Sequence, residues 1–371
     1  MWLTEAQTAY KMPRNPTCLF HTAPPLGPSN RMARPPRYDI AVWQVHDTED
    51  DCEFVIRTNN GRAFYCTILP SEFQQSPHVT QQYFKCLDLL RSGQEEIDDF
   101  YIEDAVEWLS RSFEPLVLRH ASDPLKLHRG WPTLSEYLFP ISYVCRLAAT
   151  GDELHPFILN TKDHGWESPL IPLDGKISDD LEQWTQSYEP SDVAICYSSP
   201  DVALIKPPTK VIVDAQGLQI TCFFKRFNTS FGAKFAAGEL EVLKRIAMAR
   251  LPSDALVCRL HGVVRTKSGV AGMLFPWINK KSVLCQAKAD EAAPWLRRRW
   301  ADQIYYSLEQ LHERGIIWGD AKADNVLIDE NDNAWIIDFG GSYTVGWIDK
   351  EKAGTRDGDM QGWARIMDML S

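Results

Sequence analysis

The sequence predicts an α+β protein with two domains, and three features support this. The chain has 371 residues, of which 44% are hydrophobic, and this is enough for two separate cores. Short strand-like runs bounded by turn residues occur in both halves. Stretches with apolar residues at helical spacing lie between these runs. We expect a lead-in at residues 1–36, an N-terminal α+β domain at 37–190 and a second domain at 191–371.

The charge and the apolar pattern exclude several classes of protein. The net charge is −11, the pI is about 5.4, and no basic run is typical of a protein that binds nucleic acid or an anionic membrane. No apolar stretch is long enough to span a bilayer. The first residues, MWLTEAQTAYKMPRNPTC, contain no continuous apolar segment, so we expect no secretory signal. The composition does not indicate an oligomeric state.

The cysteines indicate a reducing compartment. Nine are present, they are scattered singly, and none forms a C-x-x-C pair. Several, such as Cys222 in ITCFF and Cys258 in LVCRL, lie within apolar runs. Buried free thiols are therefore expected rather than a disulfide framework or a zinc site. We predict a cytoplasmic or nuclear protein.

The first half of the chain contains predicted elements but no pattern of catalytic residues. Seven prolines before residue 37 favour a loosely attached lead-in. Residues 38–69 are predicted to form a three-stranded antiparallel meander, with Asn60-Gly61 as a two-residue turn. Helical spacing follows at 81–91 and 97–113, and residues 114–190 are predicted to be irregular with short elements. The histidines of this half lack metal-ligand spacing.

The stretch GIIWGDAKADNVLIDENDNAWIIDFG, residues 315–340, contains the strongest candidate site. Two short apolar runs joined by a polar turn predict a hairpin, which would bring Asp320, Asn325 and Asp338 to one end. The side-chain oxygens of Asn and Asp suit Mg²⁺, which binds carboxylates together with substrate phosphates. Asp320 and Lys322 would then orient a hydroxyl and neutralise a phosphoryl group. The alternative is an ordinary polar hairpin in an unrelated domain.

GDAKADNVLID followed by IIDFG resembles the catalytic loop and the metal-binding motif of eukaryotic protein kinases. The resemblance implies a two-lobed kinase-like fold, with an N-lobe at about 191–278 and a C-lobe at about 279–371. It assigns Asp320 and Lys322 to catalysis, and Asn325 and Asp338 to Mg²⁺. A helix at about 293–314, with Pro294 in its first turn and Gly315 as its end signal, matches the helix that precedes the catalytic loop.

The same resemblance assigns residues that would hold ATP. Lys225 ends a hydrophobic strand, as does the phosphate-binding lysine of protein kinases, although a surface lysine at a strand end is the alternative. Its carboxylate partner is expected on the helical stretch that follows; we favour Glu239, and Glu241 is the competing candidate. The nucleotide base is expected beside the segment between the lobes, at Leu274, Phe275 and Trp277.

The sequence departs from the kinase pattern at three places. The loop expected at 198–208, SSPDVALIKPP, has no glycine, although glycines allow backbone N–H groups to approach phosphates. Trp318-Gly319 replaces the usual His-Arg before Asp320. No A-P-E motif follows Asp338, so a shortened C-lobe is expected, in which Asp359 resembles the aspartate that braces the catalytic loop. GGSYTVGWIDKEKAGTRDGDMQG looks like a group of fungal kinase-like proteins with a long N-terminal extension.

The function expected from this resemblance is ATP- and Mg²⁺-dependent phosphoryl transfer to a Ser or Thr hydroxyl of a protein acceptor that the sequence does not identify. Two alternatives remain. One is a pseudokinase, which keeps the fold as a nucleotide-binding or scaffold module without turnover, and the glycine-free loop favours it. The other is a kinase that acts on a small molecule.

Overall fold

The computed structural model describes residues 35–122, 131–161, 164–166, 168–173, 175–199, 202–227, 232–341 and 344–371. The chain divides into two units, residues 1–35 and 36–371. The predicted lead-in therefore lies almost entirely outside the described residues, and all of the described helices and strands belong to the second unit.

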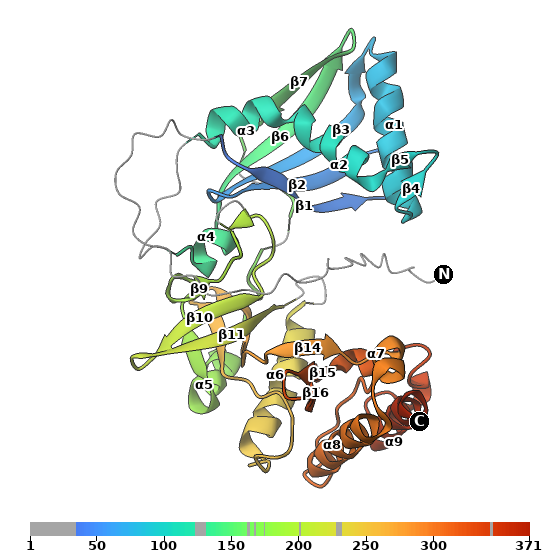
Figure 1. The fold of residues 1–371 in the computed structure, drawn as a ribbon. Coiled ribbons are helices and arrows are strands. Elements are labelled where there is room, and N and C mark those ends of the chain that lie inside the picture. Colours follow the sequence, from blue (N-terminus) through green and yellow to red (C-terminus); the bar gives the residue numbers. More distant parts are fainter. Residues whose placement is uncertain are drawn as a thin grey trace. The chain divides into compact units, whose positions relative to one another are not determined.

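The N-terminal part of the second unit contains a five-stranded sheet (Figure 1). Its order is β1-β2-β3-β6-β7, and all neighbours are antiparallel except β3 and β6, which are parallel. The strands are β1 (Tyr38–Val45), β2 (Cys52–Thr58), β3 (Arg62–Gln74), β6 (Ile141–Thr150) and β7 (Glu153–Ile158). The predicted meander is confirmed. For 114–190 the prediction of irregular structure with short elements is wrong at β6, a ten-residue strand that lies in this sheet as the parallel partner of β3.

The turn between β2 and β3 also differs from the prediction. The strands end at Thr58 and resume at Arg62, so three residues connect them rather than two. Gly61 alone in this turn has a positive φ, 79°, and its amide donates to the carbonyl of Thr58. This is the arrangement of a three-residue hairpin loop with a left-handed glycine.

Helices pack on this sheet and form its core. Apolar side chains of the strands, such as Phe54 and Phe64, are buried with Tyr83, Leu109 and Phe113 of the helical segments. The remaining elements of this part are α1 (Pro77–Ser92), β4 (Glu96–Ile97), β5 (Phe100–Tyr101), α2 (Ile102–Ser112) and α3 (Glu114–His120). The two predicted helices are confirmed, but the second begins only at Ile102, because strands β4 and β5 occupy the residues before it.

A second, six-stranded sheet has the order β8-β12-β13-β11-β10-β9. Its strands are β8 (Gln186–Tyr188), β9 (Ala194–Ile195), β10 (Lys210–Ala215), β11 (Leu218–Arg226), β12 (Gly262–Thr266) and β13 (Gly269–Pro276). Ile171 is also bound to this sheet by two main-chain hydrogen bonds of 2.9 Å to Val270. The boundary predicted at residue 191 therefore falls inside this sheet rather than before it.

Each face of the six-stranded sheet has its own apolar cluster. On one face, Phe224 and Val213 pack with α4 (Leu134–Leu138). On the other face, Met273 and Phe275 pack with α5 (Gly175–Trp184) and α6 (Gly232–Met248). Neighbouring residues of β11 point to opposite faces, which places Lys225 on the second face.

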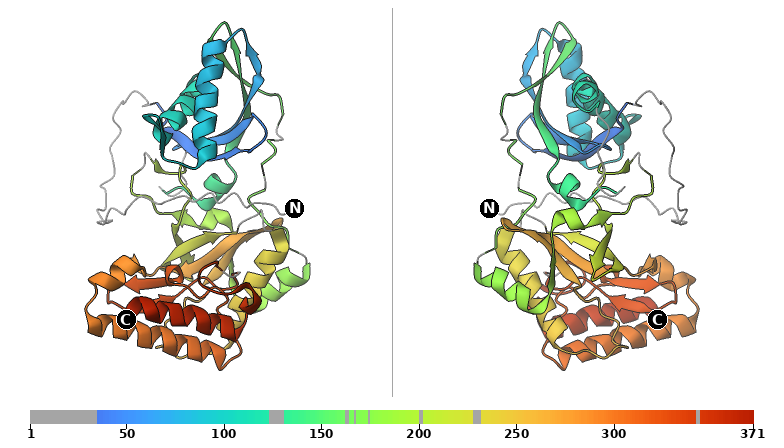
Figure 2. Two further views of the ribbon diagram at one scale, coloured as in Figure 1. Left: turned by 90° about the vertical axis from the view of Figure 1, so that its right-hand side faces the viewer. Right: turned by 90° about the vertical axis from the view of Figure 1, so that its left-hand side faces the viewer.

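The remaining elements are mainly helical. A three-stranded sheet has the order β14-β15-β16, and α8 and α9 run side by side near it (Figure 2). These elements are β14 (Lys280–Val283), α7 (Gln286–Glu291), α8 (Pro294–His312), the 3₁₀ turn η5 (Ala323–Asn325), β15 (Val326–Asp329), β16 (Ala334–Ile336) and α9 (Arg356–Leu370). The hairpin β15–β16 and the helix predicted at 293–314 are confirmed.

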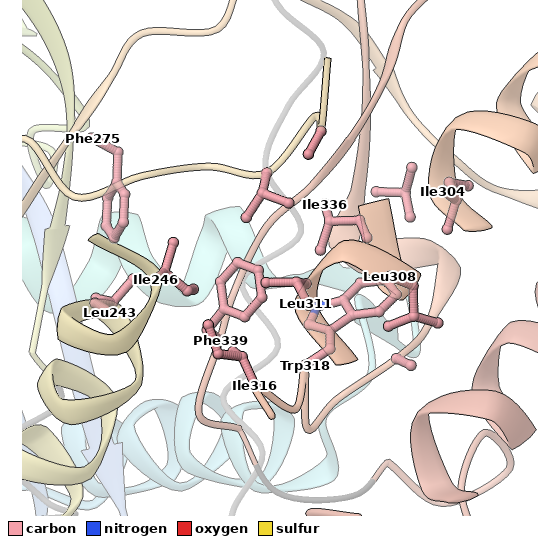
Figure 3. Packing of buried hydrophobic residues seen from close by; sticks show 14 of the residues in the cluster. Leu243, Ile246, Phe275, Ile304, Leu308, Leu311, Ile316, Trp318, Ile336 and Phe339 are labelled. Atoms are coloured by element: carbon pink, nitrogen blue, oxygen red, sulfur yellow. The ribbon is translucent and has the colours of Figure 1, made fainter. Parts of the chain in front are cut away.

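One apolar core joins the second face of the six-stranded sheet to α6, α8 and β16. Figure 3 shows Leu243 and Ile246 of α6 on one side of this core and Ile304 and Leu308 of α8 on the other. Among the described residues, no helix is both long enough and apolar enough to cross a membrane.

Candidate active site

The turn after β16 carries Asp338 past helix α6. Asp338 has φ 62°, which is uncommon for a residue other than glycine, and Gly340 has φ 78°. A Cβ atom on Gly340 would lie 3.1 Å from the Cα of Glu239. Glycine is therefore needed at this position both for its left-handed backbone and for the close approach of α6.

Lys225 joins this turn to helix α6. Its Nζ lies 2.6 Å from Oε1 of Glu239 and also forms an ion pair with Asp338. Glu239 is 4% exposed, whereas Glu241 points to solvent. The structure therefore brings Glu239, and not the competing Glu241, to Lys225.

The pKa values of this pair follow from burial and charge. Burial alone lowers the pKa of the Lys225 ammonium, but the carboxylates of Glu239 and Asp338 outweigh burial and raise it. Burial raises the pKa of Glu239, and the charge of Lys225 offsets only part of that increase. Lys225 therefore stays charged at neutral pH and holds the two carboxylates together.

A second group of polar side chains surrounds Asp320. Asn325 donates from Nδ2 to the main-chain oxygen of Asp320 at 2.9 Å and to its Oδ2 at 3.1 Å. The Nζ of Lys322 lies 2.6 Å from the same Oδ2. The hydroxyl of Thr344 donates to Oδ1 of Asp320 at 2.7 Å and accepts from Lys322 at 2.8 Å. Thr344 was not among the predicted site residues, because a single threonine after a turn carries no signal of this contact.

The main chain leading into Asp320 is held by α9. The buried carboxylate of Asp359 accepts hydrogen bonds of 2.8 Å from the amides of Trp318 and Gly319. It also lies 2.9 Å from Nε2 of His312. The sequence indicated this role for Asp359, but it contained no signal for His312, which comes from α8.

Two aromatic residues, Trp318 before Asp320 and Phe339 after Asp338, lie next to each other in the core. Trp318 is fully buried, and its Nε1 donates to the carbonyl of Ile337 at 2.9 Å. In Figure 3 the ring of Phe339 is seen between Ile246 of α6 and Trp318. Trp318 therefore contacts both sequence neighbours of Asp338, namely Ile337 through the hydrogen bond and Phe339 through packing.

The part of the chain that contains these residues matches a known protein family. Residues 225–356 match the model of the protein kinase domain. This region resembles eukaryotic protein kinases. CBL-interacting protein kinase 11 of Oryza sativa subsp. japonica is 32% identical over 112 residues, which are 28% of this chain and 21% of that protein.

Two further relatives are also protein kinases by name. Serine/threonine-protein kinase OXI1 of Arabidopsis thaliana is 33% identical over 103 residues, covering 27% of this chain and 23% of the relative. Maternal embryonic leucine zipper kinase of Xenopus tropicalis is 35% identical over 110 residues, covering 28% of this chain and 15% of the relative. The chain spans about a fifth of the length of the curated relatives that it matches.

Asn325 and Asp338 each offer side-chain oxygen atoms to a ligand. Asn325 donates through its nitrogen, which leaves its side-chain oxygen without a hydrogen bond to any described residue. The side chain of Asp338 is 45% exposed although it contacts Lys225. A group of three or more His, Cys, Asp or Glu side chains able to hold a metal is absent from the part of the chain that the structure describes. These two residues therefore fit Mg²⁺ only together with ligands such as phosphate oxygens.

The three residues expected beside a nucleotide base lie in different surroundings. Leu274 is buried in the cluster on the α4 face, whereas Phe275 is buried in the core on the α6 face. The amide of Trp277 donates to the carbonyl of Thr221 at 3.0 Å, so it is already used within the sheet. Trp277 also lines a cavity of about 450 Å³ with Cys258 and Trp335.

The glycine-free loop at 198–208 lies before the region that matches the protein kinase domain, and it forms an apolar turn. Leu204 has φ 62° and is 2% exposed. Its side chain packs with Phe224 and α4, on the face of the sheet opposite to Lys225. Residues 200 and 201 of this loop lie outside the described residues.

Proposed function

We propose that this protein transfers the γ-phosphoryl group of ATP to a Ser or Thr hydroxyl of a protein. The observation that carries the proposal is the position of Lys225, which contacts Glu239 at 2.6 Å and also contacts Asp338. A lysine held in this way places one positive charge at the position where the phosphates of ATP would bind. The match of residues 225–356 to the protein kinase domain supports the same conclusion.

Asp320 and Lys322 are proposed to act on the acceptor. The Thr344 hydroxyl donates to Asp320 and accepts from Lys322, which are the two contacts that an acceptor hydroxyl needs. An acceptor that replaced Thr344 would be oriented by Asp320, which would take its proton, while Lys322 would neutralise the phosphoryl group. Most of the rate enhancement would come from this positioning and charge.

Asn325 and Asp338 are proposed to hold Mg²⁺, which neutralises charge on the phosphates when it is bound. Leu274, Phe275 and Trp277 are proposed to lie beside the base of ATP. For Trp277 this contact is assigned to the side chain, because its amide is used by Thr221. The resemblance to fungal kinase-like proteins and the shortened C-lobe stay predictions.

The test compares Asp320→Asn with a matched variant, Asp324→Asn. Asp324 lies in the same turn but points to solvent. With labelled ATP, Mg²⁺ and a mixture of Ser- and Thr-containing peptides, Asp320→Asn is expected to lose roughly 10²–10⁴-fold in rate. Asp324→Asn is expected to keep the rate of the unchanged protein. Equal rates for all three proteins would contradict the role of Asp320.

A binding module without turnover is the second candidate function. The loop at Leu204 favours it, since this loop packs away from Lys225 instead of covering that face. The thermal midpoint with and without ATP and Mg²⁺ separates the candidates when it is combined with the transfer assay. A Mg²⁺-dependent increase without transfer to peptide or to small metabolites would support the module, and transfer to peptide would support the kinase.

A further inference from the structure

Helix α5 lies outside the region that matches the protein kinase domain, yet it packs directly on α6. Residues 225–356 give the match, whereas α5 spans Gly175–Trp184. Leu181 of α5 is 1% exposed and belongs to the same core as Leu240 and Leu243 of α6. Leu240 follows Glu239 directly on that helix, and Leu243 lies about one turn further on. The helix that carries Glu239 is therefore packed against a segment from outside the matched region.

Charged contacts connect α5 to α6 and to the sheet. Oδ1 of Asp180 lies 2.5 Å from Nζ of Lys244 on α6. On the sheet side, Arg265 of β12 donates to the hydroxyl of Ser178 at 2.8 Å and forms an ion pair with Glu182. Partly exposed ion pairs add little stability alone. In this protein these charged contacts hold α5 in one orientation between β12 and α6.

Both ends of α5 are attached to the six-stranded sheet. Before the helix, Ile171 exchanges two main-chain hydrogen bonds of 2.9 Å with Val270 of β13. After the helix, β8 pairs in parallel with β12. Strand β11, which carries Lys225, pairs with β13 in the same sheet. Thus α5 connects the element that carries Glu239 to the sheet that carries Lys225.

We infer that α5 is a positioning element that holds α6 in the orientation in which Glu239 contacts Lys225. Leu181 and Asp180 are its positioning residues, and they act through α6 without touching a substrate. Loss of their contacts would free α6 to turn or move away from the sheet, and Lys225 would keep only Asp338 as a partner. This inference rests on the proposed function for its effect on ATP, but not for its effect on the motion of α6.

The first test measures that motion by hydrogen exchange in the full chain. Asp180→Lys replaces an attraction to Lys244 by a repulsion, and Asp179→Lys makes the same change of charge at an exposed neighbour. We expect Asp180→Lys to speed exchange of the α6 amides by roughly fivefold, while α8 amides stay unchanged. Asp179→Lys should leave amide exchange unchanged in both α6 and α8. Adding Lys244→Asp to Asp180→Lys should restore slow exchange in α6.

A larger change is expected when the buried contact is removed. Leu181→Ala should speed exchange in α6 by about tenfold or more, again with α8 unchanged. If exchange in α6 is unaffected by both Asp180→Lys and Leu181→Ala, the inference is wrong. An equal increase in α6 and α8 would also overturn it, because that result means general destabilisation. These readouts need no catalytic activity.

The second test asks whether α5 acts through Glu239. In the transfer assay, Asp180→Lys should raise the KM for ATP with a smaller change in kcat. In a Glu239→Gln background the same substitution should add nothing further, because the contact that it weakens is already lost. If Asp180→Lys raised the KM for ATP by the same factor in the Glu239→Gln background, the inference would be wrong. If the unchanged protein transfers no phosphate, the proposed function fails while hydrogen exchange still decides the role of α5.

Discussion

The carboxylate of Asp359 lies 2.8 Å from the main-chain nitrogen of Trp318 and accepts its hydrogen. The second oxygen of Asp359 accepts from Gly319 in the same way. Asp359 is 1% exposed, so neither amide has water as an alternative partner. Helix α9 therefore fixes the two residues that lead into Asp320.

Replacing Asp359 by alanine is expected to destabilise the fold. Two buried N–H groups would lose their acceptor, and each such group costs about 1–3 kcal/mol. The free energy of unfolding, measured with urea, should fall by about 2–5 kcal/mol. Asp357→Ala is the control, because Asp357 lies in the first turn of the same helix but points to solvent. Similar losses in the two variants would contradict this role of Asp359.

A second prediction separates the two candidate partners of Lys225. Glu239→Gln keeps the shape of the side chain but removes the charge that faces Lys225 at 2.6 Å. Loss of one such charge-assisted contact corresponds to roughly a 10- to 100-fold change in binding. We expect a rise of this size in the Kd for ATP with Mg²⁺, measured by titration calorimetry. Glu241→Gln should leave the Kd unchanged, and a larger effect at Glu241 than at Glu239 would show that the assignment is wrong.

The sequence predicted those parts of the site that depend on local pattern. The apolar runs around the turn at 329–333 predicted β15 and β16, and the structure has both strands. The resemblance to the kinase helix favoured Glu239 over Glu241, and the structure has Glu239 in contact with Lys225. The two strands follow from an alternation of residues that local sequence determines.

The parts that the sequence missed depend on contacts between distant segments. Thr344 reaches Asp320 only because the chain folds back after Asp338. Strand β6 was predicted to be irregular, yet it is the parallel partner of β3, and parallel pairing needs a long crossover that no short pattern signals. Residues 171–188 were assigned to the N-terminal domain because their pairing with Val270 and β12 is equally non-local.

A third prediction concerns acid. Asp329 accepts hydrogen bonds from the amides of Asn331 at 2.8 Å and Asn333 at 2.9 Å, and from Nε1 of Trp335 at 2.9 Å. Burial raises the pKa of Asp329, but these hydrogen bonds outweigh burial and lower it. A carboxyl group with a lowered pKa stabilises the fold above its unfolded pKa of about 3.9, and this stability is lost as the pH falls through the lower, folded value.

The measurement is the free energy of unfolding of the unchanged protein and of Asp329→Asn between pH 3 and 6. We expect Asp329→Asn to be less stable at pH 6, because an amide cannot accept all these hydrogen bonds. The difference should shrink below about pH 4 as the native carboxyl group is protonated. Asp324→Asn serves as the control at an exposed carboxylate. A difference that stays constant with pH would contradict the prediction.

The last prediction separates two contributions of Trp318. This residue is fully buried in the core beside Phe339, and its Nε1 donates to the carbonyl of Ile337 at 2.9 Å. Trp318→Ala removes both the packing and the hydrogen bond, and such changes cost about 3–5 kcal/mol. Trp295→Ala is the matched control, because Trp295 is 65% exposed and should change stability by less than about 0.5 kcal/mol.

Trp318→Phe keeps a smaller aromatic ring in the core and leaves the carbonyl of Ile337 without its donor. The hydrogen bond to this partly buried carbonyl contributes about 0.5–1.5 kcal/mol, so this variant should lie between Trp318→Ala and the unchanged protein. Because Ile337 precedes Asp338 directly, Trp318→Phe should also weaken the Mg²⁺-dependent binding of ATP more than its stability loss alone explains. Stability equal to that of the unchanged protein would mean that the hydrogen bond to Ile337 does not stabilise the fold, and unchanged ATP binding would mean that Ile337 does not transmit the contact to Asp338.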